Sequence, residues 1–276
     1  MPNPNRDAAQ QYARDLLANL SLTDVPVDPF EVAKRLEIKV EAADVGTDFS
    51  GCLLQAGSKF AILYSSAIDH DGFRAFTVSH EIGHYEIPSH RFLYGTGDGH
   101  RSQSNFTARE WYEQEADAFA SELLMPATAM LAEMRGADPG LATIKKMADR
   151  FLTSLTSTAI RYAELTPDPV VVIVSDSSKI LYSFRSACMK SVRLGYIDRG
   201  APIPNASVTG RLMRERSAGK REMEGGCYLS AWVENPVRDL PFSEDVIDLG
   251  RYGRILTVLH REQLPADDDD DGEDDY

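Results

Sequence analysis

The chain has few cysteines and no long apolar run, and both absences limit the class of protein. Its three cysteines form no C-x-x-C pair, so the sequence predicts neither a disulfide framework nor a thiolate metal site. The apolar runs, such as residues 170–174, are far shorter than the roughly 18 residues that span a bilayer. The first residues also lack the basic-then-apolar pattern of a signal peptide. We therefore expect a soluble, cytoplasmic protein with no membrane partner.

Positive charge is scarce as well, and much of the negative charge lies at the C-terminus. The formal net charge is −14, and residues 267–276 contain seven Asp and one Glu with no Lys or Arg, so the rest of the chain carries −6. No segment has the dense Lys/Arg stripe of a nucleic-acid-binding protein, so direct binding to nucleic acid is not expected. Acidic runs repel themselves and bury no apolar surface, so residues 265–276 are predicted to form a disordered tail. The tail either solubilises the protein or contacts a basic surface.

The first half of the chain mixes helical and strand-like periodicity, which predicts an α+β domain over residues 1–140. Strands are expected at 38–42, 51–55 and 60–64. Helices are expected at 6–20, 29–36, 73–86 and 126–134. The capping-box pattern of Thr107 and Glu110 predicts one more helix, which ends at 125–126.

The second half begins with a helical segment and ends with strands. Residues 141–166 are amphipathic with a Thr/Ser break, a pattern shared by a helix-turn-helix and by two packed helices. Pro167 and Pro169 then end this segment. Period-2 alternation predicts a small mixed α/β domain over residues 170–262, with strands at 170–175, 179–184, 226–232 and 254–260.

The strongest motif is the H-E-x-x-H sequence that runs from His80 to His84 inside a predicted helix. Residues four apart lie one above the other on a helix face, so both imidazoles can reach one metal ion. Glu81 points about 100° away from His80 and is the candidate general base for the attacking water. The alternative is two ordinary histidines beside an idle glutamate.

A catalytic zinc site needs a third protein ligand, and the next predicted helix supplies the candidates. Glu113 shares its helix face with small and apolar residues, so it is expected to point inward. Asp117 follows one turn later and is placed to accept the free ring N–H of a ligand histidine. Glu115 lies on the face of Trp111 and Phe119 and is the second choice as ligand. A buried Glu and Asp without a metal would be costly, which also favours a metal site.

Two separate motifs give the chain a family resemblance. H-E-I-G-H at 80–84, followed by E-x-x-A-D-x-F-A-x-x-L-L-M-P at 113–126, resembles the ImmA/IrrE family of bacterial and phage metallopeptidases. The likeness covers residues 5–165. It implies a minimal zincin-like domain in which a small curved sheet covers the metal-binding helix. In one branch of the family a GAF-like domain follows the peptidase, so a GAF- or PAS-like fold is expected for 170–262.

The resemblance also implies roles for residues and a substrate class. It assigns His80, His84 and Glu113 as metal ligands and Glu81 as the base. Known members act on helix-turn-helix repressors of the XRE type and so release stress-response or mobile-element genes. We therefore expect a zinc-type metalloendopeptidase with such a repressor as its protein substrate; manganese or iron is the alternative metal.

Two other functions stay open. The protein could sequester a transcription factor without cleaving it, around a structural metal site, although a structural site needs no base at Glu81. It could also be a ligand sensor through residues 170–262, where no ligand motif is recognisable. The donor that would stabilise the oxyanion is undecided, with candidates Tyr85, His90, Tyr94 and His100.

Overall fold

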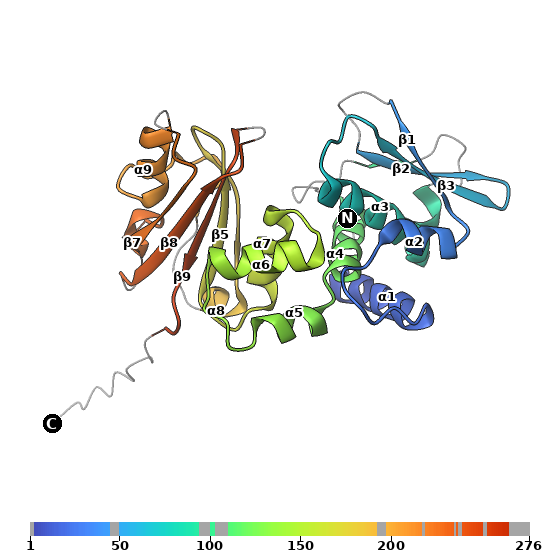
Figure 1. The fold of residues 1–276 in the computed structure, drawn as a ribbon, viewed down its shortest axis with the longest axis horizontal. Helices are drawn as coiled ribbons and strands as arrows, with labels where there is room; N and C mark the ends of the chain where they lie inside the picture. Colours follow the sequence, from blue (N-terminus) through green and yellow to red (C-terminus); the bar gives the residue numbers. More distant parts are fainter. Residues whose placement is uncertain are drawn as a thin grey trace. The chain divides into compact units, whose positions relative to one another are not determined.

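The computed structural model describes residues 3–44, 50–93, 100–102, 110–191, 197–216, 219–234, 236, 239–250 and 253–264. The fold is mixed α+β, as the sequence predicted, and the chain divides into two compact units (Figure 1). Unit 1 comprises Met1–Ala137 and Ala142–Leu165, and unit 2 comprises Asp138–Leu141 and Thr166–Tyr276. The predicted acidic tail, 265–276, lies outside the described residues. Within the described ranges, no helix has the length and apolar character needed to cross a membrane.

Unit 1 opens with two helices, α1 (Arg6–Asn19) and α2 (Pro29–Arg35), each with a side-chain cap. The Asn5 side chain accepts a hydrogen bond from the first turn of α1, and the Asp28 carboxylate does the same for α2. Both helices start where Asn or Asp satisfies a backbone N–H that has no partner within the helix.

The sheet of unit 1 has the order β1-β3-β2-β4. Its strands are β1 (Lys39–Ala43), β2 (Gly51–Ala56), β3 (Lys59–Ser65) and β4 (His100–Ser102). β1 and β3 are parallel, and β2 is antiparallel to both β3 and β4. Leu53 and Ile62 are paired in register and fully buried, which fixes the face of the sheet that covers the core.

The other helices of unit 1 include the two that carry the motifs described above. They are α3 (Asp71–Glu86), the 3-10 helix η1 (Pro88–Leu93), α4 (Trp111–Leu124), α5 (Ala127–Met134), α6 (Leu141–Phe151) and α7 (Leu155–Leu165). α4 starts at Trp111 with Glu110 as its N-cap and no side-chain cap bond, whereas Thr107 of the predicted capping box lies outside the described residues.

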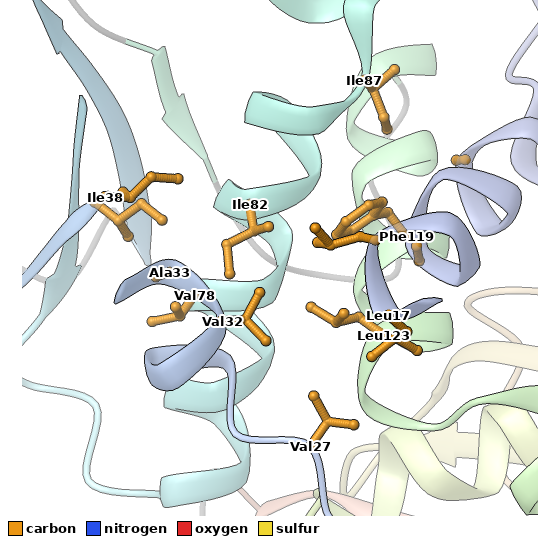
Figure 2. Packing of buried hydrophobic residues seen from close by; sticks show 14 of the residues in the cluster. Leu17, Val27, Val32, Ala33, Ile38, Val78, Ile82, Ile87, Phe119 and Leu123 are labelled. Carbon is orange, nitrogen blue, oxygen red and sulfur yellow. The ribbon is translucent and has the colours of Figure 1, made fainter. Parts of the chain in front are cut away.

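The core of unit 1 lies between α1, α3, α4 and the sheet. Ile82 of α3, Phe119 and Leu123 of α4, and Leu17 of α1 belong to one buried cluster (Figure 2). A Cβ added at Gly83 would lie 3.1 Å from the Phe119 ring, so glycine permits the close approach of α3 and α4. This close approach brings the two motif-bearing helices together.

Unit 2 is built on one antiparallel sheet with the order β6-β5-β9-β8-β7. Its elements are β5 (Val170–Ser175), β6 (Ile180–Arg185), α8 (Ala187–Ser191), α9 (Val208–Glu215), β7 (Glu222–Tyr228), η3 (Leu229–Ala231), β8 (Pro241–Asp248) and β9 (Ile255–His260). Counted within the unit, the order is 2-1-5-4-3. The GAF- or PAS-like fold that the resemblance implies for this unit stays a prediction. The sequence analysis missed β8, the second strand from one edge.

Candidate metal centre

The H-E-x-x-H residues lie in the middle of α3, on the buried part of the helix. His80, Glu81 and His84 are each 0% exposed. The helix begins at Asp71, where the His70 ring accepts a hydrogen bond from the Phe73 N–H. The motif is therefore held by two and a half turns of preceding helix and by the core contacts of Ile82.

The two histidines and Glu113 converge on one point. His80 Nε2 lies 3.2 Å from Glu113 Oε2, and His84 Nε2 lies 3.5 Å from Glu113 Oε1. The two Nε2 atoms are 3.1 Å apart. Among the described residues this is the one group of three metal-ligating side chains with ligand atoms that all lie within 4.8 Å of one another. Two imidazoles and one carboxylate fit the donor set of a catalytic zinc site.

The third predicted partner, Asp117, contacts the far side of His80. His80 Nδ1 and Asp117 Oδ1 are 2.9 Å apart, and Asp117 is buried on α4 one turn after Glu113. A carboxylate only accepts hydrogen bonds when ionised, so this contact places the proton of His80 on Nδ1. The other ring nitrogen of His80, Nε2, faces Glu113.

Sequence reasoning missed a second chain of contacts, behind His84. His84 Nδ1 lies 3.0 Å from His90 Nδ1, and His90 Nε2 lies 3.0 Å from Glu115 Oε2. His90 belongs to η1 and is 0% exposed, and Glu115 is also buried. Glu115, the second choice as ligand, is therefore not among the three converging side chains. Only the H-x₅-H spacing of His84 and His90 hinted at this contact.

Burial and the neighbouring carboxylates shift the pKa values of the site in different directions. Burial lowers the pKa of His84 to about 3, and burial also lowers the pKa of His90. Burial lowers the pKa of His80 too, but hydrogen bonds to Asp117 and Glu113 outweigh it and raise that pKa well above its usual value. Burial raises the pKa of Asp117. His84 is thus neutral at pH 7, the form in which imidazole binds a metal.

The Glu81 carboxylate lies beside Gly51, the first residue of β2. A Cβ added at Gly51 would lie 3.0 Å from Glu81 Oε1 and 2.5 Å from Thr77 Cγ2. Glycine at this position therefore leaves the space that the Glu81 carboxylate occupies. Glu81 itself is fully buried on the same helix as both histidines.

The candidates for an oxyanion donor have separate locations. Tyr85 packs edge-on against Phe60 of the sheet, and both ring nitrogens of His90 are already in contact with other groups. The side chains of Tyr94 and His100 lie outside the described residues. Tyr112, not considered from the sequence, has its ring centroid 6.3 Å from that of His84, and burial raises the pKa of its hydroxyl.

A buried helix with H-E-x-x-H beneath a small sheet, joined by a downstream Glu, defines a zincin-like domain. Residues 33–162 match the Peptidase_M78 family model, described as the IrrE N-terminal-like domain, and this match confirms the family resemblance for that part of the chain. A family of this kind supports a metal-dependent peptidase or an IrrE-like regulator.

A solved structure with a similar fold is known. A Mycobacterium tuberculosis transcriptional regulator superimposes with a TM-score of 0.58 and 15% sequence identity, over 93% of this chain and 76% of that chain. At this identity the likeness shows a shared fold alone. No curated protein sequence matches the chain.

Proposed function

We propose that the protein is a zinc-type metalloendopeptidase that makes selective cuts in a transcriptional repressor. The observation that carries the proposal is the buried convergence of His80, His84 and Glu113, with Glu81 on the same helix as both histidines. A structural metal site needs ligands but no general base. The buried glutamate beside the ligands therefore favours catalysis over a non-proteolytic regulatory protein.

His80, His84 and Glu113 would hold the metal, and Asp117 would orient His80 through its ring N–H. A bound zinc ion supplies Lewis acidity, which polarises a peptide carbonyl and acidifies water. Glu81 accepts the proton of the attacking water and passes it to the amine that leaves when the peptide bond breaks. We favour zinc because of the two imidazoles, although the same donors also bind manganese or iron when availability decides.

The proposed substrate is a helix-turn-helix repressor of the XRE type, acted on in the cytoplasm. The family resemblance supports this substrate class, and the M. tuberculosis structure with the shared fold is itself described as a transcriptional regulator. The formal charge of −14 would favour encounter with a basic, DNA-binding protein. The peptidase residues all precede Pro167, so we assign catalysis to residues 1–166 and leave 170–262 a regulatory or structural role.

The test is cleavage of purified candidate repressors, with and without a metal chelator, by the wild-type protein and by Glu81→Gln. The amide cannot accept the proton of water, so Glu81→Gln should retain its metal and lose about 10²–10⁴-fold in rate. Full cleavage by Glu81→Gln would exclude the proposed mechanism. Repressor that binds tightly to the wild-type protein and stays intact would instead indicate sequestration.

A further inference from the structure

A hydrogen-bonded chain of three side chains runs away from the proposed metal site. It leads from His84 on α3 to His90 on η1 and ends at Glu115 on α4. Each contact is 3.0 Å long, and all three side chains are buried, at 0%, 0% and 5% exposure. Neither the family resemblance nor the sequence analysis gives His90 and Glu115 these positions.

The chemistry of the carboxylate sets the direction of every hydrogen bond in this chain. An ionised Glu115 can only accept, so His90 carries its proton on Nε2. The Nδ1 atom of a neutral His90 is then an acceptor, and the proton between the two rings belongs to His84 Nδ1. The remaining nitrogen, His84 Nε2, has a lone pair that faces His80 Nε2 and Glu113.

Glu115 is itself fixed by the backbone. The Asn5 N–H, just before α1, donates to Glu115 Oε1 at 2.7 Å, while Oε2 receives the His90 proton. Each carboxylate oxygen therefore meets one donor. Because glutamine offers a single acceptor oxygen, it could not satisfy both donors in the same position.

Hydrogen bonds thus connect each of the two proposed ligand histidines to a carboxylate on α4, one directly and one through another histidine. His80 reaches Asp117 directly at 2.9 Å, whereas His84 reaches Glu115 through His90. In both cases the carboxylate holds the proton on Nδ1 and leaves Nε2 for the metal. Ring orientation by such an acceptor also raises the basicity of the ligand nitrogen.

We infer that His90 and Glu115 are positioning residues for the metal centre, which fix His84 in the tautomer and orientation that bind the ion through Nε2. The inference rests on the proposed metal site and deepens it. It gives the centre two residues, from η1 and α4, that act through His84.

The first test reads the tautomers directly in the full-length wild-type protein loaded with zinc. Nitrogen-15 NMR of the imidazoles should show His84 protonated at Nδ1 and His90 neutral and protonated at Nε2. A His90 ring protonated at Nδ1, or at both nitrogens, would overturn the inference. This measurement needs no variant, so it stands even where a substitution impairs folding.

The second test measures zinc affinity by competition with a chelator, using zinc alone as the probe. His90→Phe keeps a ring beside Trp111, which it contacts edge-on, but removes both nitrogens; zinc affinity should fall about 10–100-fold. His90→Gln keeps one acceptor and one donor about as far apart as the ring nitrogens, so it should recover part of the loss. Glu115→Gln should also weaken binding, because one of its two donors loses its acceptor.

Two control variants match these substitutions. His260→Gln removes a histidine that pairs with Asp245 at 3.1 Å in unit 2, and Glu110→Gln removes an exposed carboxylate at the N-cap of α4. Both should bind zinc as the wild type does. Cobalt-loaded His90→Phe should also show an altered visible absorption spectrum, since the spectrum reports the geometry around the ion.

The outcomes separate this inference from the proposed function. Wild-type protein that binds no zinc would overturn both. Wild-type protein that binds zinc, together with a folded His90→Phe variant of equal affinity and unchanged cobalt spectrum, would overturn the positioning role alone. Weakened binding in His90→Phe and partial recovery in His90→Gln would support it, whatever the substrate proves to be.

Discussion

Both units bury carboxylates, but the groups that surround them differ. In unit 2, Glu244 is 0% exposed and accepts hydrogen bonds from the Thr209 N–H and hydroxyl, each at 2.7 Å, and from Trp232 Nε1 at 3.3 Å. In unit 1, Asp117 and Glu115 are also buried, but each of them contacts an imidazole, and Glu115 also accepts a hydrogen bond from the Asn5 N–H.

This difference separates a structural carboxylate from one that belongs to a site. The donors around Glu244 include a backbone amide, a hydroxyl and an indole, with the Cys227 thiol beside them, and none of these groups belongs to an imidazole. Behind Asp117 and Glu115, the hydrogen bonds lead to His80 and His84, whose Nε2 atoms face each other at 3.1 Å. These two nitrogens and the Glu113 carboxylate form the one group of metal-ligating side chains found among the described residues. A buried carboxylate therefore indicates a functional site only when its hydrogen bonds lead to side chains that converge with other metal-ligating residues.

The largest effect that we expect is loss of metal from unit 1. His80→Ala and Glu113→Ala each leave two of three ligands, so elemental analysis should find no tightly bound metal in either purified protein. Glu244→Gln is the matched control in unit 2 and should keep its metal. Unchanged metal content in both ligand variants would overturn the site, and loss in Glu115→Ala alone would show that the wrong carboxylate was assigned.

The next effect concerns the stability of unit 2. Glu244→Leu leaves up to three buried donors without an acceptor, at about 1–3 kcal/mol each, so the free energy of unfolding should fall by about 3–5 kcal/mol. Urea unfolding of unit 2 can be followed by Trp232 fluorescence in a Trp111→Phe background. Glu244→Gln keeps one acceptor and should lose less.

Zinc affinity should not change in either of these Glu244 variants. A stability loss below 1 kcal/mol in Glu244→Leu would mean that Glu244 is not the structural counterpart of the unit 1 acids. A loss of metal in the same variant would remove the distinction between the two units altogether.

The convergence of the candidate ligands could be predicted from the sequence because their spacing is local. His80 and His84 are four apart on one helix, and Glu113 and Asp117 are four apart on another, so each pair is set by helix geometry. The fold class followed from periodicity in the same way. The packing of α3 against α4 could not be predicted from either segment alone. The small residues along α4 indicated that another helix packs closely against it.

Residues placed by tertiary contacts were less accessible to sequence reasoning. Glu115 was assigned to a different face of the helix from Glu113, but α4 packs on both α1 and α3, and its buried residues occur all around its circumference. On the buried face of β8, the acids Glu244 and Asp248 alternate with Phe242 and Val246, so two acidic residues stand where the pattern expects apolar ones. The strand was missed because its buried acids are satisfied by residues far along the chain.

A smaller expected effect is the change in zinc affinity when Asp117 is replaced. It should separate the contribution of the hydrogen bond to His80 from that of the negative charge. Asp117→Ala removes the acceptor of the His80 Nδ1 proton, and zinc affinity should fall about 10–100-fold. Asp117→Asn keeps an acceptor oxygen but no charge, so its affinity should lie between those of Asp117→Ala and the wild type. Titration with a competing chelator checks this order; equal affinities in all three proteins would reduce Asp117 to a packing residue.

The smallest expected effect concerns the charge of Glu244 and is measured through the reactivity of the Cys227 thiol. Burial raises the pKa of Cys227, and the negative charge of Glu244 raises it further. Cys227 and Cys188 are both partly exposed, and iodoacetamide reacts with the thiolate. Cys227 should therefore label more slowly than Cys188 at pH 8 to 9, as resolved by peptide mass spectrometry. Glu244→Gln removes the charge but not the burial, and each unit by which the pKa falls raises the thiolate fraction about tenfold. Cys227 should therefore label faster in Glu244→Gln while remaining slower than Cys188. Unchanged labelling of Cys227 in this variant would show that Glu244 carries no charge in the folded unit, and the comparison with the ionised acids of unit 1 would then fail.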